Sequence, residues 1–197
     1  MGRVISASAT AVVVLASTAA AAPEQVTILS RGAFTLYGSV ATEKADEIVT
    51  IQAKDCRQQF FRDFLSARTR EGGAWSTQTW SVAINTTLRA VWNGHTSAEI
   101  FVRKRAGILL RQRSPRRFSV SVQNHAGAMF WRKRFLFQRF DRRLGTWLTV
   151  RRVVLTESDG STTFTASVPK GSLVRAVIPL SQARPCYAAG YSPLLRT

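Results

Sequence analysis

The second half of the chain repeats the first at a spacing of about 86 residues. Val49–Gln52 (VTIQ) aligns with Phe135–Gln138 (FLFQ), and Leu88–Val91 (LRAV) aligns with Val174–Val177 (VRAV). The spacing is an even number, so apolar residues keep the same place in the strand alternation in both copies. Phe135 and Phe137 therefore match Val49 and Ile51, and we predict that all four lie in a core. The repeat indicates two units of one fold.

Each copy shows the pattern of short β-strands. Alternating runs such as Ile48–Ala53 and Leu88–Trp92 are separated by turn residues, and Asn93-Gly94 is a strong signal for a type I′ hairpin turn. Units of about 80 to 90 residues with several such strands are typical of a small antiparallel β-sandwich. We predict an all-β protein with two tandem antiparallel β-sandwich domains, residues 23–104 and 105–197.

Four segments of the first copy resemble the tandem bacterial immunoglobulin-like or fibronectin-like domains of secreted proteins: Phe34–Val40, Glu47–Ala53, Gly73–Trp75 and Asn85–Trp92. They match the opening strand, the VTIQ strand, a G-x-W strand start and the penultimate strand of such domains. The resemblance covers nearly all of the chain after residue 22 and implies Ig-like sandwiches. It implies little about function, because this fold supports many functions.

Residues 1–22 have the pattern of a cleaved signal peptide. Arg3 gives a positive start, Val4–Ala19 is uncharged, and Ala19–Ala22 offers small residues for cleavage. The alternative is a membrane anchor, but the run is shorter than the ~20 predominantly apolar residues of a spanning helix. We predict a secreted or envelope-associated protein whose mature chain has no transmembrane segment.

The two cysteines do not occupy equivalent positions in the two copies. Cys56 follows the VTIQ strand, while Cys186 lies in Ala183–Tyr191, an insertion of the second copy that precedes Ser192, the counterpart of Ser97. In an exported protein two cysteines are more often joined than free, so we favour a disulfide between the domains. The alternative is two separate thiols, which would hold if their Cα atoms were more than ~7 Å apart.

Positive charge is concentrated in the second copy. Residues 23–104 hold ten basic and eight acidic side chains, whereas residues 105–197 hold seventeen basic and three acidic ones. Such an asymmetry indicates a polyanionic partner. The alternative is compositional, because 23 of the 28 basic residues are arginine and the chain is rich in alanine and valine.

The basic side chains that we predict to bind a polyanion come from three stretches of the second copy. They are Arg113, Arg116, Arg117, Arg132, Lys133, Arg134, Arg142 and Arg143. We expect them to hold the protein to anionic cell-envelope polymers or lipid headgroups. Nucleic acid is an alternative partner, since aromatic residues are interleaved with these arginines. Carbohydrate binding is a third, if Trp75 or Trp80 were exposed. The sequence makes no prediction of oligomeric state.

The sequence does not indicate an enzyme. The phosphate-loop, zinc-helix, nucleophile-elbow and dinucleotide motifs do not occur in it. His95 and His125 lie beside turn residues and are expected to face solvent. Two histidines and two cysteines offer few metal ligands. We therefore predict no catalytic residues, no metal site and no cofactor. Trp75 follows the glycines that open a strand and is expected in the core, and Asn85 is interpreted as a strand lead-in rather than a glycosylation site.

Overall fold

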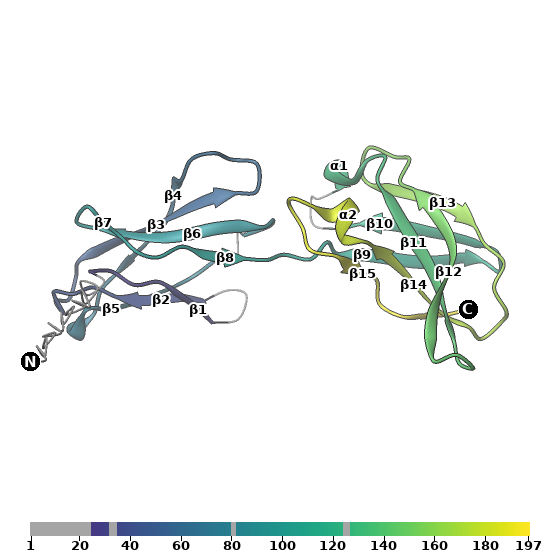
Figure 1. The fold of residues 1–197 in the computed structure, drawn as a ribbon, viewed down its shortest axis with the longest axis horizontal. Helices are drawn as coiled ribbons and strands as arrows, with labels where there is room; N and C mark the ends of the chain where they lie inside the picture. Colours follow the sequence, from purple (N-terminus) through teal and green to yellow (C-terminus); the bar gives the residue numbers. More distant parts are fainter. Residues whose placement is uncertain (1–24, 32–34, 80–81, 124–126) are drawn as a thin grey trace, which may run out of the picture.

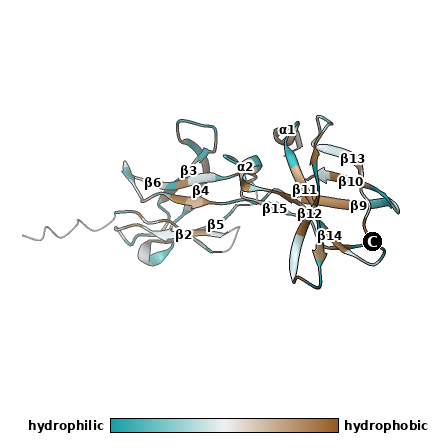
Figure 2. Cartoon of the chain, turned by 45° about the vertical axis from the view of Figure 1, so that its right-hand side comes forward, coloured by the Kyte–Doolittle hydropathy of each residue, from teal (hydrophilic) through white to brown (hydrophobic). Residues whose placement is uncertain are grey.

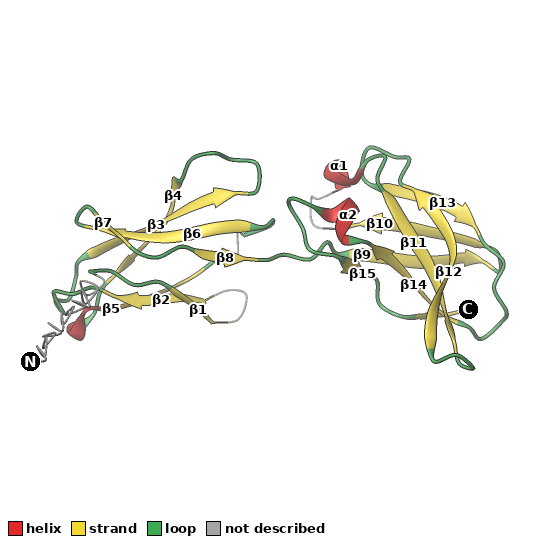
Figure 3. Cartoon of the chain, viewed as in Figure 1, coloured by secondary structure: helices red, strands yellow, loops and turns green. Residues whose placement is uncertain are grey.

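The computed structural model describes residues 25–31, 35–79, 82–123 and 127–197. In these ranges the chain forms two bodies of β-sheet that lie end to end, with residues 103–107 between them (Figure 1). Both bodies consist mainly of strands, and the helices are single turns (Figure 3). The predicted fold class, two tandem antiparallel sandwiches, is confirmed. The predicted leader, residues 1–22, lies outside the described residues, as do Trp80 and His125.

The first body packs a three-stranded sheet, in the order β1-β2-β5, on a larger sheet in the order β4-β3-β6-β7, in which β8 also pairs with β6. The bounds are β1 Leu29–Arg31, β2 Thr35–Ser39, β3 Ile48–Asp55, β4 Arg62–Arg68, the 3₁₀ turn η1 Glu71–Gly73, β5 Ala74–Gln78, β6 Thr86–Trp92, β7 His95–Thr96 and β8 Ile100–Val102. Asn93 and Gly94 join β6 to β7 with φ of 44° and 80°, as the predicted turn requires.

The second body repeats this arrangement, with sheets in the orders β13-β10-β9 and β12-β11-β14-β15, in which β16 also pairs with β14. The bounds are β9 Ile108–Ser114, β10 Arg117–Val122, α1 Gly127–Phe130, β11 Arg134–Asp141, β12 Thr146–Val154, β13 Ser161–Thr165, β14 Leu173–Ile178, α2 Leu180–Ala183, β15 Gly190–Tyr191 and β16 Leu195–Arg196. All pairings between these strands are antiparallel. The division at residues 104 and 105 remains our proposal for the domain boundary.

The two bodies share individual hydrogen bonds as well as strand order. Ser97 Oγ accepts the Ala90 N–H at 2.9 Å, and Ser192 Oγ accepts the Ala176 N–H at 2.9 Å. Each serine also donates its own N–H to the carbonyl of the same alanine, at 2.9 Å in both bodies. The alignment of Ser97 with Ser192, on either side of an insertion, therefore corresponds to one structural position.

Each body has its own hydrophobic core. One cluster of buried side chains draws only on residues 26–92 and the other only on residues 106–187. Val49, Ile51, Phe135 and Phe137 are all fully buried, as the alternation predicts. Hydrophobic stretches follow the strands of both bodies (Figure 2). Each sandwich therefore buries apolar surface of its own, and Cys56 and Ile84 of the first body also pack against the second core.

Trp75 belongs to the first core, as expected, with 2% of its surface exposed. It packs on Gly38 of β2, where an added Cβ would lie 2.7 Å from the indole Cζ2 atom and 2.0 Å from the Thr27 carbonyl oxygen. Thr27 cannot easily withdraw, because its N–H bonds the Ser39 carbonyl at 2.9 Å. A side chain at position 38 would therefore force the strands or the tryptophan apart.

We expect Gly38→Ala to destabilise the first domain by at least about 2 kcal/mol, since overpacking against backbone cannot be relieved by a rotamer change. Urea denaturation of the variant measures this loss. Gly72→Ala is the control, because its Cβ would meet no atom within 4 Å and only the left-handed backbone, with φ of 78°, is strained. That strain costs about 1 kcal/mol. An equal loss in both variants would contradict the predicted steric clash.

The two bodies are joined by the predicted disulfide. Cys56 and Cys186 form a bridge with their Cα atoms 5.1 Å apart, which rules out the alternative of separate thiols. Cys56 follows β3 of the first body, and Cys186 follows α2 in the insertion of the second. The insertion of the second copy therefore supplies the contact with the first.

Asn85 reinforces this junction with all four of its polar groups. Its N–H donates to the Cys186 carbonyl at 2.8 Å, and its Nδ2 donates to the Pro185 carbonyl at 2.8 Å. Its Oδ1 accepts the Lys104 N–H at 2.9 Å, and its carbonyl accepts the Cys56 N–H at 3.0 Å. The side chain is buried and immediately precedes β6, as expected of a strand lead-in.

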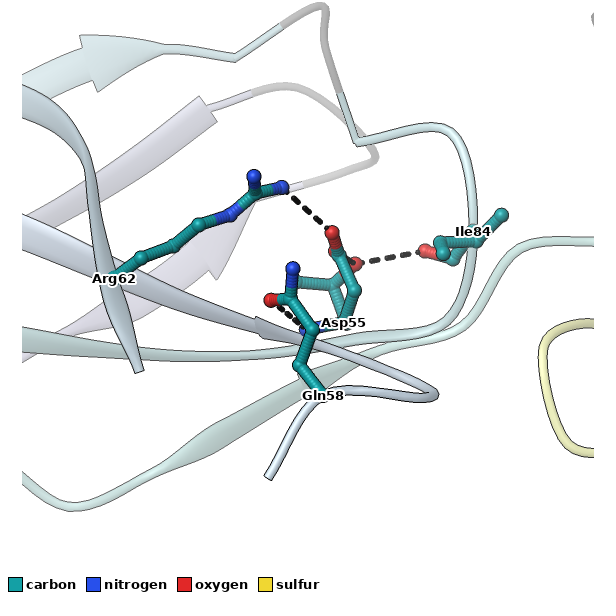
Figure 4. Close-up of polar contacts among 5 residues, drawn as sticks. Asp55, Gln58, Arg62 and Ile84 are labelled. Carbon is teal, nitrogen blue, oxygen red and sulfur yellow. Dashed lines mark hydrogen bonds and ion pairs between the residues drawn. The ribbon is translucent and has the colours of Figure 1, made fainter. Parts of the chain in front are cut away.

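The segment around Cys56 is itself held in place by Asp55 (Figure 4). The Asp55 carboxylate accepts hydrogen bonds from Arg62 Nη2 at 2.8 Å and from Thr86 Oγ1 at 2.7 Å. Thr86 Oγ1 also lies 3.0 Å from the Ile84 carbonyl. The first body therefore offers a fixed point of attachment to the second.

Candidate polyanion-binding surface

The eight predicted basic residues do not form one patch. Arg132, Lys133 and Arg134 lie at the start of β11, whereas Arg142 and Arg143 follow its end. A strand of eight residues rising about 3.3 Å per residue separates the two groups by roughly 25 Å. The β-sandwich therefore divides the predicted site between its two ends.

The first group lies at the junction with the first body. Lys133 lines a small cavity together with Cys186, and the Arg134 N–H donates to Gln182 Oε1 of α2 at 3.0 Å. The guanidinium of Arg132 lies 4.3 Å from the ring centre of Trp131. This end of the second domain, defined by α1, α2 and residues 131–134, is called the junction pole below.

The second group lies at the opposite end, which we call the distal pole. The distal pole consists of the β9–β10 turn (115–116), the β11–β12 turn (142–145) and the β13–β14 loop (166–172). Figure 1 shows these segments along the right and lower side of the second body, away from the first body. Arg116 and Arg117 also belong to it. Arg113 lies near this end on the outer face of β9, where its Nε donates to Ser119 Oγ at 2.9 Å.

A groove of about 540 Å³ crosses the distal pole. It collects side chains from three remote segments, the β11–β12 turn, the β13–β14 loop and β16. Its basic members are Arg139, Arg142, Arg143, Lys170 and Arg196, and its one acidic member is Asp141. A strongly positive groove of this kind attracts phosphate or carboxylate groups, to which guanidinium forks bind in bidentate fashion.

The single carboxylate of this groove is engaged in holding the turn. Asp141 Oδ1 accepts the N–H groups of Arg143 at 2.9 Å and Leu144 at 3.1 Å, and Oδ2 lies 3.6 Å from Arg139 Nη2. Gly145 then returns the chain with φ of 61°. Asp141 therefore neutralises part of Arg139 while it fixes the backbone that presents Arg142 and Arg143.

A second basic groove, of about 640 Å³, runs between the edge strands β12 and β13. Its basic members are Arg117, Arg151 and Arg152. Arg151 reaches across from β12 to bond the Thr165 carbonyl on β13, and its Nη1 lies 3.2 Å from Thr165 Oγ1. Arg116 lines the adjoining groove with Arg151, so basic side chains continue from the distal pole along this edge.

Sequence reasoning missed Arg139, Lys170 and Arg196 as members of the distal groove. Lys170 and Arg196 are isolated basic residues in the sequence, about 28 and 54 positions from Arg142, so no local charge run marks them. Arg139 alone carried a signal, because it belongs to the same arginine-rich stretch as Arg142. Only the pairing of β14 with β11 and β16 brings these segments together.

Sequence reasoning also missed a cation–aromatic pair that occurs in both domains. Arg89 lies 4.0 Å from the ring centre of Phe61, and Arg175 lies 4.0 Å from that of Trp147, so the pairs obey the 86-residue spacing. Arg175 also lies 5.1 Å from the ring centre of Tyr191. Burial lowers the pKa of Arg175, and a charge on Tyr191 opposes that shift. The Arg175 guanidinium stays protonated at physiological pH. Arg175 therefore carries a permanent positive charge beside the Trp147 ring.

The structure also places the tryptophan and histidine residues that the sequence singled out. Trp75 is buried, so its ring cannot stack on a sugar. The hypothesis that the protein binds carbohydrate through an exposed Trp75 is therefore wrong. His95 is exposed at the hairpin, as expected. Within the described ranges, no group of three or more His, Cys, Asp or Glu side chains could hold a metal ion. The helices described here are also too short or too polar to cross a membrane.

The sequence matches no protein-family model and no curated protein. Among solved structures, the chain is similar to a segment of two fibronectin type-III domains from chicken tenascin, with 13% identity, a TM-score of 0.44, and coverage of 89% of this chain and 99% of that one. A chain of a cytokine receptor complex is similar with 9% identity and a TM-score of 0.35, and the match covers 87% of this chain and 94% of that one. A chain that contains the BSP domain of a biofilm-associated protein is similar with 10% identity and a TM-score of 0.30. The match covers 84% of this chain and 27% of that one.

Proposed function

We propose that this chain is an exported, non-catalytic binding protein whose second domain attaches it to anionic, phosphate-rich components of the cell envelope. The observation that carries the proposal is the charge of the distal pole. Its loops and adjoining strand ends present Arg116, Arg117, Arg139, Arg142, Arg143, Lys170 and Arg196. The acidic residue among these seven basic side chains is Asp141, and its carboxylate already accepts hydrogen bonds from the backbone of the β11–β12 turn.

The disulfide supports export. Bridges of this kind persist in oxidising compartments and are rare where thiols are kept reduced. Here the bridge joins two segments 130 residues apart and, with Asn85, connects the two sandwiches. A fixed junction would hold the first domain away from whatever surface the distal pole contacts. The first domain would then be the part presented to other molecules.

The positions of the three acidic residues of the second domain also favour the distal pole over the junction pole as the place where an anion binds. Glu157 and Asp159 lie in the turn that follows Leu155, whose carbonyl accepts the Arg132 N–H at 2.9 Å. They therefore lower the positive potential near Arg132–Arg134. The distal pole has only Asp141, so an anion would be drawn to that end.

We expect Arg142→Glu/Arg143→Glu to weaken binding to isolated cell envelope at least about 30-fold at low salt. Each basic residue near an anionic surface contributes about 1 kcal/mol, and reversal also adds repulsion. Co-sedimentation of the protein with envelope, at low and near-physiological salt, measures this change. Binding by the unaltered protein should fall as salt rises, because the interaction is a charge interaction at an exposed surface.

Lys133→Glu/Arg134→Glu is the matched control, since it reverses the same number of charges at the junction pole. We expect it to reduce binding by less than the distal variant. Equal losses would mean that net charge alone matters, as in the compositional interpretation, and salt-insensitive binding would contradict the proposal. Competition with DNA separates the alternative partner, because a nucleic-acid-binding surface would be emptied by DNA more readily than by wall polymer.

A further inference from the structure

The tip of the distal pole carries an exposed leucine among its arginines. Leu144 is 63% exposed and directly follows Arg142 and Arg143 in the β11–β12 turn. The side chain is held out by the turn, because its own N–H bonds Asp141 Oδ1 at 3.1 Å and Gly145 takes the left-handed conformation beside it. A hydrogen-bonded turn therefore keeps an apolar group in water at the basic distal pole.

A single exposed leucine is ordinary on protein surfaces. The difference here lies in its neighbours. Arg142 and Arg143 share a groove with Lys170 and Arg196, and Pro169, another exposed apolar residue, lies beside Lys170 in that groove. The tip thus combines exposed apolar side chains with several basic side chains that line the same groove.

This combination matches the boundary between lipid headgroups and acyl chains. Arginines at that depth contact lipid phosphates, and an aliphatic side chain a few ångströms deeper is removed from water. A soluble polyanion such as polyphosphate or DNA satisfies the arginines but gives Leu144 no apolar medium to enter. The leucine therefore distinguishes a bilayer from a free polymer as the source of phosphate.

We propose that the distal pole docks on the surface of an anionic lipid bilayer, with Arg142 and Arg143 on lipid phosphates and Leu144 inserted at the acyl boundary. This inference rests on the proposed function and names the lipid surface as the partner of the same site. The first domain would stay clear of this contact, because in Figure 1 the β11–β12 turn projects downward from the second body while the first body lies to its left.

The test uses the protein with its disulfide intact and vesicles of phosphatidylcholine with or without 30% phosphatidylglycerol. We expect binding only to the anionic vesicles. Leu144→Ser should lower the partition coefficient about tenfold while leaving binding to polyphosphate unchanged. Leu180→Ser is the control, because Leu180 is also exposed, at 42%, but lies in α2 at the junction pole. It should leave vesicle binding unaltered.

A direct readout of insertion comes from Leu144→Cys labelled with a polarity-sensitive fluorophore. Both native cysteines are paired, so the new thiol would be the reactive one. Its emission should shift to the blue on anionic vesicles, and the same label at Leu180→Cys should not shift.

Unchanged vesicle binding by Leu144→Ser, or no emission shift at position 144, would overturn insertion. Binding to polyphosphate without binding to anionic vesicles would overturn the lipid partner and leave the proposed function standing. Binding to neither probe would overturn both.

Discussion

Phe137→Ala is expected to lower the free energy of unfolding of the second domain by about 3–5 kcal/mol, the usual range for deleting a buried phenyl ring. Phe137 is fully buried, and its ring centre lies 4.8 Å from that of Phe118 and 5.1 Å from that of Phe164. These rings come from both sheets of the sandwich, so the cavity would lie between the layers. Small domains are stabilised by only about 5–15 kcal/mol, so the loss is a large part of the total.

Urea denaturation followed by circular dichroism measures this change. Phe140→Ala is the matched control on the same strand. Phe140 is partly exposed on the outer face of β11, where its ring centre lies 5.3 Å from that of Trp147. We expect that substitution to cost about 1 kcal/mol, mainly from the lost aromatic pair. A similar loss in both variants would contradict the assignment of core and outer faces in β11.

Reduction of the Cys56–Cys186 bridge is expected to lower stability by about 2–4 kcal/mol and to loosen the angle between the domains, while both sandwiches stay folded. The bridge closes a loop with a sequence separation of 130, so it restricts the unfolded chain strongly. It crosses between two bodies whose cores draw on separate sets of strands, and Cys186 belongs to the second core while Cys56 packs against that core. The Asn85 hydrogen bonds would remain as the weaker link.

Calorimetry and small-angle scattering, with and without reductant, test this expectation. The reduced protein should unfold at a lower temperature, and its scattering should show a broader distribution of shapes. The double variant Cys56→Ser/Cys186→Ser should behave like the reduced protein and should not respond to reductant. A transition and a scattering curve that reduction leaves unaltered would contradict the role assigned to the bridge.

The strand faces and the core were predictable from sequence because burial in a strand alternates with a period of two. The match of Val49 and Ile51 with Phe135 and Phe137 needed only an even spacing, and the four side chains are all buried. The hairpin at Asn93-Gly94 was predictable for a similarly local reason, since few residue pairs accept positive φ at two successive positions.

The disulfide was predictable in part. Two cysteines in a chain with a predicted leader favour a pair, but the sequence left separate thiols open, because the approach of Cys56 to Cys186 depends on how the domains meet. Asn85 was identified as a strand lead-in, whereas its four hydrogen bonds to the junction had no sequence signal. All four partner groups are backbone groups of residues in other segments, and backbone groups carry no residue-type information.

The sequence by itself determined that this protein is two copies of an all-β unit, which positions face each core, and that the second copy is basic. The tertiary structure alone decided where that basic charge lies. It separated Lys133 and Arg134 from Arg142 and Arg143 by the length of β11, and it brought Lys170 and Arg196 beside the latter pair. The physical reason is that alternation along a strand is a local property of the backbone. The meeting of loops at the end of a sandwich depends on strand pairings between residues far apart in the chain.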